Sequence, residues 1–217
     1  VAARLGPASD VGGVDIYSHD AGIDVSGAES GEVRYDIQED ANMWLHLGCA
    51  IAGLLTMRTG ALFIAKQYTL YRTFTWGLIL FYSTLFDRFY LTKPLTSRPT
   101  NSEIYLVGVG FRGVDRATVD ILCDRLRRRD SSPLWPQQAV RLLPAVASLQ
   151  KFVRIVHGQQ RSMMLEMVHL NSQYTPAQIA DAARGIKHEL NQRWLRKYPV
   201  HHISAEDRVR IIYVGIF

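Results

Sequence analysis

The sequence has few cysteines: only Cys49 and Cys123 occur among its 217 residues, and both fall in segments with a helical pattern. Neither has a partner at the spacing of a metal site, and two separate thiols do not make a disulfide framework. We therefore expect no zinc cluster, no disulfide-stabilised fold and a reducing compartment. The adjacent His201 and His202 lack a carboxylate or thiol at ligand spacing, so no metal is expected there either.

The sequence also lacks an export signal and an uninterrupted long apolar run. No positively charged start followed by an apolar core and a small-residue cleavage site opens the chain. Residues 43–65 approach the roughly 20 residues that span a bilayer. Arg58, Thr59 and Gly60 interrupt this stretch, however. A helix, a turn and a strand are therefore expected there, and no membrane partner is expected.

Positive charge is scarce in the first half of the chain. Residues 1–111 hold 8 Lys and Arg against 11 Asp and Glu, whereas residues 112–217 hold 17 against 9. The net charge of +5 therefore comes from the second half. A polyanion such as RNA is expected to meet the protein there.

Apolar patterns in the first half alternate between strand and helix periods, which indicates an α/β fold. Residues 1–31 are rich in Gly, Ser, Asp and Ala and are expected to be irregular. The order that follows predicts a parallel sheet that ends in an antiparallel hairpin. The expected strands are 32–37, 61–65, 88–92 and 103–109, and the expected helices are 39–57, ended by Gly60, and 72–87.

The second half shows helical patterns only, at 118–129, 137–157, 160–171 and 176–197. Prolines punctuate these segments, and Thr175-Pro176 has the form of a helix cap followed by proline at the first helical position. The composition changes near residues 112–117. We therefore predict two domains, residues 1–112 and a basic helical domain of residues 113–217.

Three expected strand ends carry Asp36, Lys66 and Glu103. Strand ends at the carboxyl edge of a parallel sheet are where reactive side chains converge. A ribose hydroxyl is nearly neutral at physiological pH, so an enzyme that modifies it needs a lysine with a lowered pKa. Simpler interpretations stay open: Asp36 could cap a helix, Lys66 could reach solvent, and Glu103 could be an edge-strand charge.

Three segments carry a resemblance to a known family. The strongest is residues 97–107, SRPTNSEIYLV, and the others are YDIQE at residues 35–39 and FIAK at residues 63–66. Together they resemble the ribose 2′-O-methyltransferase domain of the large polymerase protein of non-segmented negative-strand RNA viruses, which is similar to FtsJ-type RNA methyltransferases. The resemblance covers roughly residues 10–112.

This resemblance implies the C-terminal half of a Rossmann-like methyltransferase sheet followed by an all-helical C-terminal domain. It implies S-adenosylmethionine as methyl donor, capped RNA as substrate, and a Lys-Asp-Lys-Glu tetrad of which Asp36, Lys66 and Glu103 are the last three members. The first lysine and the Gly-rich donor loop would lie upstream of Val1. The chain would belong to a larger polymerase protein, with a viral phosphoprotein as cofactor, in the host cytoplasm and virion or in the nucleus.

Basic residues outside the tetrad are candidates for RNA contact, although runs such as residues 125–129 (RLRRR) are also typical of solvated helix faces. Tyr68, Tyr71 and Arg72 follow Lys66 and could stack on an RNA base or simply pack. The predicted RNA-binding residues are Arg98, Arg125, Arg128, Lys187, Arg193 and Lys197.

A second hypothesis treats the chain as a non-catalytic module that binds RNA or docks on a polymerase, with the methyltransferase sheet as scaffold. It predicts salt-sensitive RNA binding by residues 112–217 without donor binding. A membrane-associated protein is disfavoured by Arg58 and by the overall hydropathy.

Overall fold

The computed structural model of the chain describes residues 4–5, 13–23, 25, 37–94, 97–98, 100–135 and 144–197. The chain forms two compact units, residues 1–164 and residues 165–217. The first unit contains the sheets and most of the helices. The second contains the end of helix α5 and helix α6.

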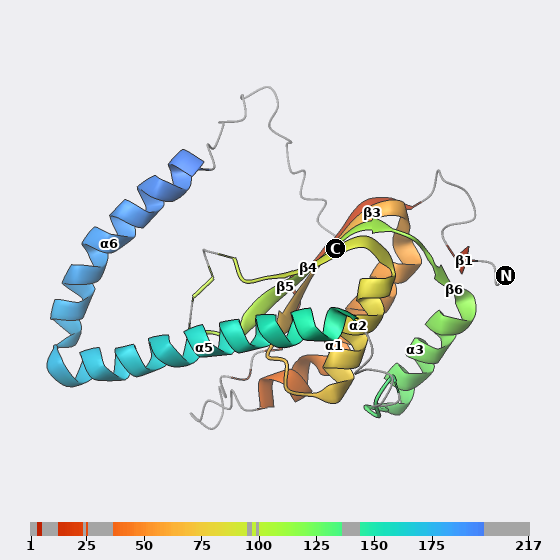
Figure 1. The fold of residues 1–217 in the computed structure, drawn as a ribbon, viewed down its shortest axis with the longest axis horizontal. Coiled ribbons are helices and arrows are strands. Elements are labelled where there is room, and N and C mark those ends of the chain that lie inside the picture. Colours follow the sequence, from red (N-terminus) through yellow and green to blue (C-terminus); the bar gives the residue numbers. More distant parts are fainter. Residues whose placement is uncertain are drawn as a thin grey trace, which may run out of the picture. The chain divides into compact units, whose positions relative to one another are not determined.

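A four-stranded sheet forms the centre of the first unit (Figure 1). Its strands are β2 (Val14–His19), β3 (Met57–Tyr68), β5 (Glu103–Phe111) and β4 (Phe86–Thr92), in this spatial order. β2 is parallel to β3, whereas β5 is antiparallel to both β3 and β4. The predicted antiparallel hairpin is formed by β4 and β5, but the predicted parallel sheet needs correction, because among these four strands only β2 and β3 pair in parallel and the sheet is mixed. Two short strands, β1 (Arg4–Leu5) and β6 (Val114–Asp115), pair separately.

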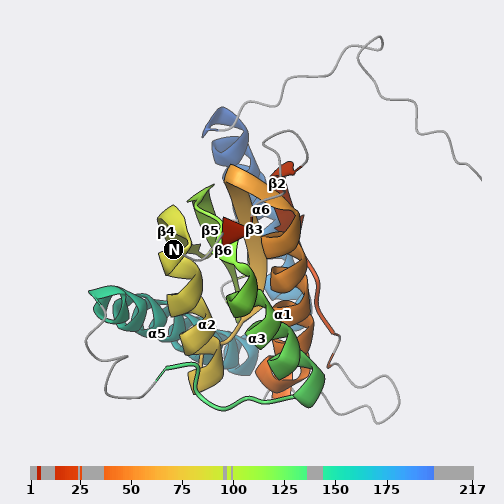
Figure 2. The ribbon, with the colours of Figure 1, turned by 90° about the vertical axis from the view of Figure 1, so that its right-hand side faces the viewer.

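Helices α1 (Gln38–Thr56) and α2 (Thr73–Thr84) cover one face of this sheet (Figures 1 and 2). Because successive side chains of a strand point to opposite faces, β3 alternates between buried and half-buried residues. Ala61, Phe63 and Ala65 face the helices and are buried. The opposite face of the same strand carries Lys66, and this alternation turns it away from the apolar core.

Two expectations for the first half need correction. The segment 1–31 is not wholly irregular, because residues 14–19 form β2. Helix α1 agrees with the predicted 39–57, but β3 begins directly after it at Met57 instead of at residue 61. The extra residues of β3 form an irregularity against β2, in which Gly60 has a φ of 85° that favours glycine. Of the strand expected at 32–37, residues 32–36 lie outside the described residues.

The helices after residue 112 belong in part to the first unit. Val119 and Leu122 of α3 (Arg116–Arg128) and Val146, Leu149 and Val156 of α5 (Pro144–Gln173) are buried in the same core as the sheet. The boundary predicted at residue 112 therefore falls inside this unit. Of the helices predicted at 137–157 and 160–171, the described residues form one helix, α5, which continues through Gly158. Residues 137–143 lie outside the described residues.

The described part of the second unit, residues 165–197, is helical and mostly exposed. Helix α6 (Pro176–Lys197) begins where it was predicted, and the Thr175 hydroxyl accepts a hydrogen bond from the amide of Gln178 at 3.4 Å. None of the described helices combines the length and the apolar character needed to cross a lipid bilayer.

A buried carboxylate on α1 fixes the turn that leaves β3. Glu39 is 3% exposed, and its oxygens accept hydrogen bonds from the Thr69 hydroxyl at 3.1 Å and from the amides of Tyr71 at 2.8 Å and Arg72 at 3.0 Å. These amides directly precede α2, where negative charge is stabilising. Thr69 has a φ of 32°, a conformation that is uncommon for residues other than glycine. Glu39 therefore holds this turn and the start of α2 together.

Replacing Glu39 with alanine should lower the free energy of unfolding by roughly 2–4 kcal/mol, because three donors lose their buried, charged acceptor. Urea denaturation would measure the change. Asp40→Ala is the matched control, because the exposed carboxylate of Asp40 pairs with Arg72 at the surface. This variant should leave the midpoint of the urea transition nearly unchanged. Equal midpoints for the two variants would contradict this role of Glu39.

Candidate active site

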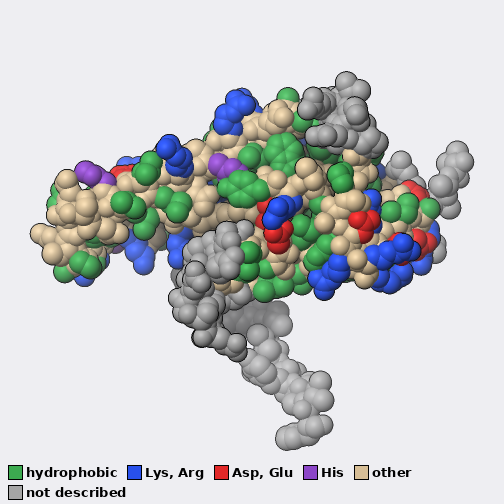
Figure 3. All heavy atoms as spheres, turned by 90° about the horizontal axis from the view of Figure 1, so that it is seen from below, with side chains coloured by type: hydrophobic (Ala, Val, Ile, Leu, Met, Phe, Trp, Pro, Cys, Tyr) green, Lys and Arg blue, Asp and Glu red, His purple; other side chains and the backbone are tan. Residues whose placement is uncertain are grey.

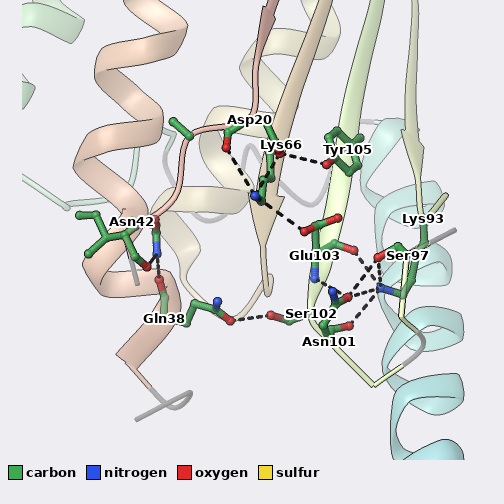
Figure 4. Close-up of polar contacts among 12 residues, drawn as sticks. Asp20, Gln38, Asn42, Lys66, Lys93, Ser97, Asn101, Ser102, Glu103 and Tyr105 are labelled. Atoms are coloured by element: carbon green, nitrogen blue, oxygen red, sulfur yellow. Dashed lines mark hydrogen bonds and ion pairs between the residues drawn. The ribbon is translucent and has the colours of Figure 1, made fainter. Parts of the chain in front are cut away.

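Lys66 lies at the centre of a cluster of charged and polar side chains (Figure 4). Its side chain is only 12% exposed, and Nζ lies 3.0 Å from Asp20 Oδ1 and 3.7 Å from Glu103 Oε2. Nζ also lies 5.3 Å from the centre of the Tyr68 ring. Tyr105 completes the cluster by donating a hydrogen bond to Asp20 Oδ1 at 3.0 Å.

The sheet topology explains why these groups meet. β2 is parallel to β3, and His19 pairs with Ala65, so Asp20 follows β2 beside Lys66. β5 runs in the opposite direction, so its first residue, Glu103, lies at the same edge where β3 ends. The structure thus brings Lys66 and Glu103 together, as the strand-end argument expected. Asp36 lies outside the described residues, and its role stays a prediction.

Sequence analysis missed Asp20, the carboxylate that contacts Lys66. The signal was present in residues 14–20, VDIYSHD, a short strand pattern that ends in an acid. It was overlooked because the surrounding residues are rich in Gly, Ser and Asp, which are typical of loops. The pairing of β2 with β3 could not be seen from residues 14–20 alone.

The neighbours of Lys66 keep its ammonium group charged. Burial acts to lower the pKa of Lys66, but the interactions with Tyr68 and Asp20 outweigh it, so the pKa is raised above its ordinary value. The hydrogen bond with Lys66 in turn lowers the pKa of Asp20. Burial, together with the hydrogen bond to Asp20, raises the pKa of Tyr105 to about 12. The lowered lysine pKa expected from the sequence is therefore wrong for the cluster that these residues form.

Two residues of α1 hold the segment that follows Asp20. Asn42 is fully buried, and its side chain accepts a hydrogen bond from the Ile23 amide at 2.6 Å and donates one to the Ile23 carbonyl at 3.4 Å. One turn later, His46 Nε2 lies 3.2 Å from the Ala21 carbonyl oxygen. Asn42 and His46 both contact backbone atoms. They therefore fix the path of residues 21–23 independently of the side chains of those residues. This arrangement determines where Asp20 lies.

Two histidines lie behind the cluster and carry no charge at physiological pH. Burial lowers the pKa of His46, whose Nδ1 lies 3.0 Å from Gln67 Oε1. Burial, aided by the proximity of His46, lowers the pKa of His19 to about 4. Neither imidazole therefore competes with Lys66 for the carboxylate of Asp20.

Lys93 organises the loop that leads from β4 to Glu103. Its Nζ donates hydrogen bonds to Asn101 Oδ1 at 2.7 Å, to the Asn101 carbonyl at 3.1 Å, to the Glu103 carbonyl at 3.0 Å and to Ser97 Oγ at 3.2 Å. Burial lowers the pKa of Lys93. Arg98, a predicted RNA-binding residue, is exposed on this loop.

The other predicted RNA-binding residues lie on helices and have varied surroundings. Arg125 is largely buried at the end of α3, where it donates a hydrogen bond to the Ser132 carbonyl at 2.8 Å. Arg128 pairs with Asp124 at 3.1 Å and Arg193 pairs with Glu189 at 2.6 Å. Lys187 and Lys197 lie on α6 in the second unit. Their contact with RNA stays a prediction.

Comparison with known proteins assigns this arrangement to a family. The family described as FtsJ-like methyltransferase matches residues 3–111, which include Asp20, Lys66 and Glu103. The chain belongs to the FtsJ-like methyltransferase family. The sheet, its two covering helices and the charged cluster all lie within the matched residues, whereas α3, α5 and α6 follow it.

Among its relatives is the "Probable methyltransferase EP424R" of African swine fever virus (strain Badajoz 1971 Vero-adapted). It is 40% identical over 122 residues, which are 56% of this chain and 27% of the relative. The "Cap-specific mRNA (nucleoside-2′-O-)-methyltransferase 1" of Bos taurus is 36% identical over 129 residues, 57% of this chain and 15% of the relative. The chain thus matches about a quarter or less of the length of these proteins.

FtsJ-like methyltransferases use S-adenosylmethionine. Two cavities among the described residues can be compared with this donor, and neither fits it. A cavity of about 20 Å³ between α1, α2 and β3 is large enough for only one water molecule. A cavity of about 270 Å³ between α2, β4 and α5 is lined mainly by apolar side chains, which offer nothing to a charged amino-acid group. A donor pocket upstream of Val1 stays a prediction.

Replacing Asp20 with asparagine should lower the pKa of Lys66. Burial lowers this pKa, and the variant loses the carboxylate charge that helps to raise it. NMR titration of lysine labelled with ¹³C at Cε would follow this one side chain. Asp15→Asn is the matched control, since Asp15 pairs with Arg58, and it should leave the Lys66 titration unchanged. A Lys66 pKa that is the same in wild type and Asp20→Asn would exclude the contact.

Replacing Asn42 with alanine should release the segment after Asp20, because the Ile23 amide loses its buried acceptor. Hydrogen exchange at the Ile23 amide should become faster, and the free energy of unfolding should fall by roughly 1–3 kcal/mol. Exchange at the Phe63 amide, in the middle of the sheet, serves as an internal reference. Uniform acceleration at both amides would instead indicate a general loss of stability.

Proposed function

We propose that this chain forms the acceptor side of an S-adenosylmethionine-dependent enzyme that methylates a ribose 2′-oxygen of capped mRNA. The observation that carries the proposal is the position of the Lys66 ammonium group between the carboxylates of Asp20 and Glu103. Membership of the FtsJ-like family supports methyl transfer, and the relative from Bos taurus, whose name specifies cap mRNA 2′-O-methylation, supports the substrate.

The described residues act on the acceptor. Lys66 is protonated, so it can donate a hydrogen bond to the ribose oxygen and fix its position, which is a large part of the acceleration when two reactants must be aligned. The acceptor hydroxyl passes its proton to solvent while its oxygen replaces sulfur on the methyl carbon. The nearby ammonium group stabilises the negative charge that the departing proton leaves on the oxygen. Asp20 and Glu103 hold this group in place.

Asp20 is the carboxylate that positions Lys66 in this proposal, and the role of Asp36 stays a prediction. The Asp20 carboxylate is the nearer of the two that contact Lys66, and Tyr105 orients it from the other side. A second cation close to Lys66 would favour the neutral amine and lower the pKa of the lysine. The first lysine of the tetrad, expected upstream of Val1, would supply such a cation. A neutral Lys66 amine could then also accept the proton of the ribose 2′-hydroxyl.

Narrower expectations from the resemblance are kept as part of the proposal. They are a place within the large polymerase protein of a non-segmented negative-strand RNA virus, a viral phosphoprotein as cofactor, and action in the host cytoplasm and virion or in the nucleus. Arg98 is the predicted RNA-binding residue best placed for the site, because its loop leads to Glu103.

Lys66→Ala should reduce methyl transfer to capped RNA about 100-fold or more, since a positioned acid or base contributes this much. Labelled-methyl transfer from S-adenosylmethionine would be measured with the longest natural polypeptide that contains this chain. Lys151→Ala, an exposed lysine on α5, is the matched control and should retain activity. Capped RNA with a 2′-deoxy first nucleotide should accept no methyl group at that position.

Full activity in Lys66→Ala would exclude the proposed role of this lysine. If wild type binds capped RNA in a salt-sensitive manner but transfers no methyl group, the non-catalytic RNA-binding alternative replaces the proposal. Methyl transfer to the 2′-deoxy RNA at the level of the normal substrate would show that another atom is the acceptor.

A further inference from the structure

Tyr71 is an exposed aromatic residue on a rigid backbone. Its side chain is 69% exposed, although its amide donates a hydrogen bond to the buried carboxylate of Glu39 at 2.8 Å. The neighbouring amide of Arg72 is bonded to the same carboxylate at 3.0 Å. The ring of Tyr71 is therefore held on a fixed backbone while most of its surface faces water.

A second ring, from a distant part of the chain, lies against Tyr71. The centre of the His157 ring on α5 is 4.9 Å from that of Tyr71, with an angle of 37° between the rings. His157 is half-buried, and this burial lowers its pKa. The imidazole is therefore uncharged at physiological pH, and one face of the tyrosine ring is supported while much of the ring stays accessible.

This pair of rings belongs to the same edge as the charged cluster. The amide of Thr69, in the turn before Tyr71, donates a hydrogen bond to the carbonyl of Ser102, the neighbour of Glu103, at 3.3 Å. On α5, Gln160 lies almost one turn after His157, and its side chain donates to the Thr100 carbonyl at 3.0 Å. The turn, the loop before β5 and α5 are thus bonded to one another. Figure 3, a view from below, shows histidine, hydrophobic and charged side chains near one another on that face.

Tyr68, the other tyrosine in this region, has no free ring face of this kind. It is half-buried, its ring stacks on His46 at 5.8 Å, and its hydroxyl lies against Gly22, where a Cβ atom would come within 2.6 Å of it. Lys66 lies over the same ring. Tyr68 therefore packs, and Tyr71 is the residue available to a ligand.

We propose that Tyr71 and His157 form a stacking surface for a nucleobase of the single-stranded RNA acceptor, beside the ribose held at Lys66. Aromatic side chains bind unpaired bases through their π faces with little dependence on sequence. This inference rests on the proposed function and adds to it. His157 and Gln160 follow residue 111, where the family match ends, so the helical segment contributes to substrate binding.

Tyr71→Ala should raise KM for capped RNA about tenfold, because one stacked base is lost, while kcat changes less than about twofold. Tyr71→Phe should resemble wild type, because the ring is kept, and Tyr71→Leu should resemble the alanine variant. Tyr90→Ala is the matched control, since this tyrosine is 48% exposed on β4, and it should leave KM unchanged. His157→Ala should raise KM by a smaller factor.

Binding without turnover separates this inference from the proposed function. A short capped RNA with 2-aminopurine near its first nucleotide should lose fluorescence on binding to wild type and to Tyr71→Phe, but not to Tyr71→Ala. This result would support stacking even if no methyl transfer occurred, in which case only the proposed function fails. Unchanged quenching and KM in Tyr71→Ala, or wild-type behaviour of Tyr71→Leu, would overturn the stacking surface.

Discussion

A nearly buried ammonium group needs anionic partners, because the cost of removing a charge from water is several kcal/mol unless it is paired and hydrogen-bonded. Lys66 meets this requirement with Asp20 from one neighbouring strand and Glu103 from the other. The charge therefore connects three strands at one edge of the sheet. Tyr68 and Asp20 also raise the lysine pKa, so the pair with Asp20 both stabilises the cluster and keeps its central group protonated.

The first turns of α1 hold all three segments that surround this charge. Gln38 accepts a hydrogen bond from Ser102, next to Glu103, at 2.9 Å. Glu39 holds the turn that follows β3, and Asn42 holds the segment that follows β2. These residues lie in the first two turns of one helix, so a displacement of its start would move all three segments at once. The helix is a support for the site although it supplies none of the charged side chains that contact Lys66.

Sequence patterns predicted the elements with strong periodicity or distinctive chemistry. The apolar run before Lys66 predicted the central strand, and SRPTNSEIYLV predicted the loop and strand that carry Glu103. Asp20 was missed because β2 is short, mostly exposed and set among loop-forming residues. Its identity depends on pairing with a strand about forty residues later, and local propensity does not contain such non-local information.

The contacts of Asn42 and Glu39 could not be predicted either, for a related reason. A polar residue in an amphipathic helix is usually solvent-exposed, and only the approach of distant backbone groups makes its burial favourable. The predicted end of the first domain was wrong on similar grounds. Charge and helical composition change near residue 112, but α3 and the first part of α5 still bury apolar side chains in the core of the sheet.

The raised pKa of Lys66 also limits what this lysine can do in the proposed reaction. Two carboxylates against one ammonium group leave an excess of negative charge, which favours the protonated lysine and suits it to orient an oxygen rather than to accept a proton. A further positive charge at this edge would reverse that preference, and either a protein side chain or a cationic donor molecule would have this effect. The described cluster is therefore electrostatically adapted to a cationic neighbour, which agrees with the sulfonium charge of the family's methyl donor.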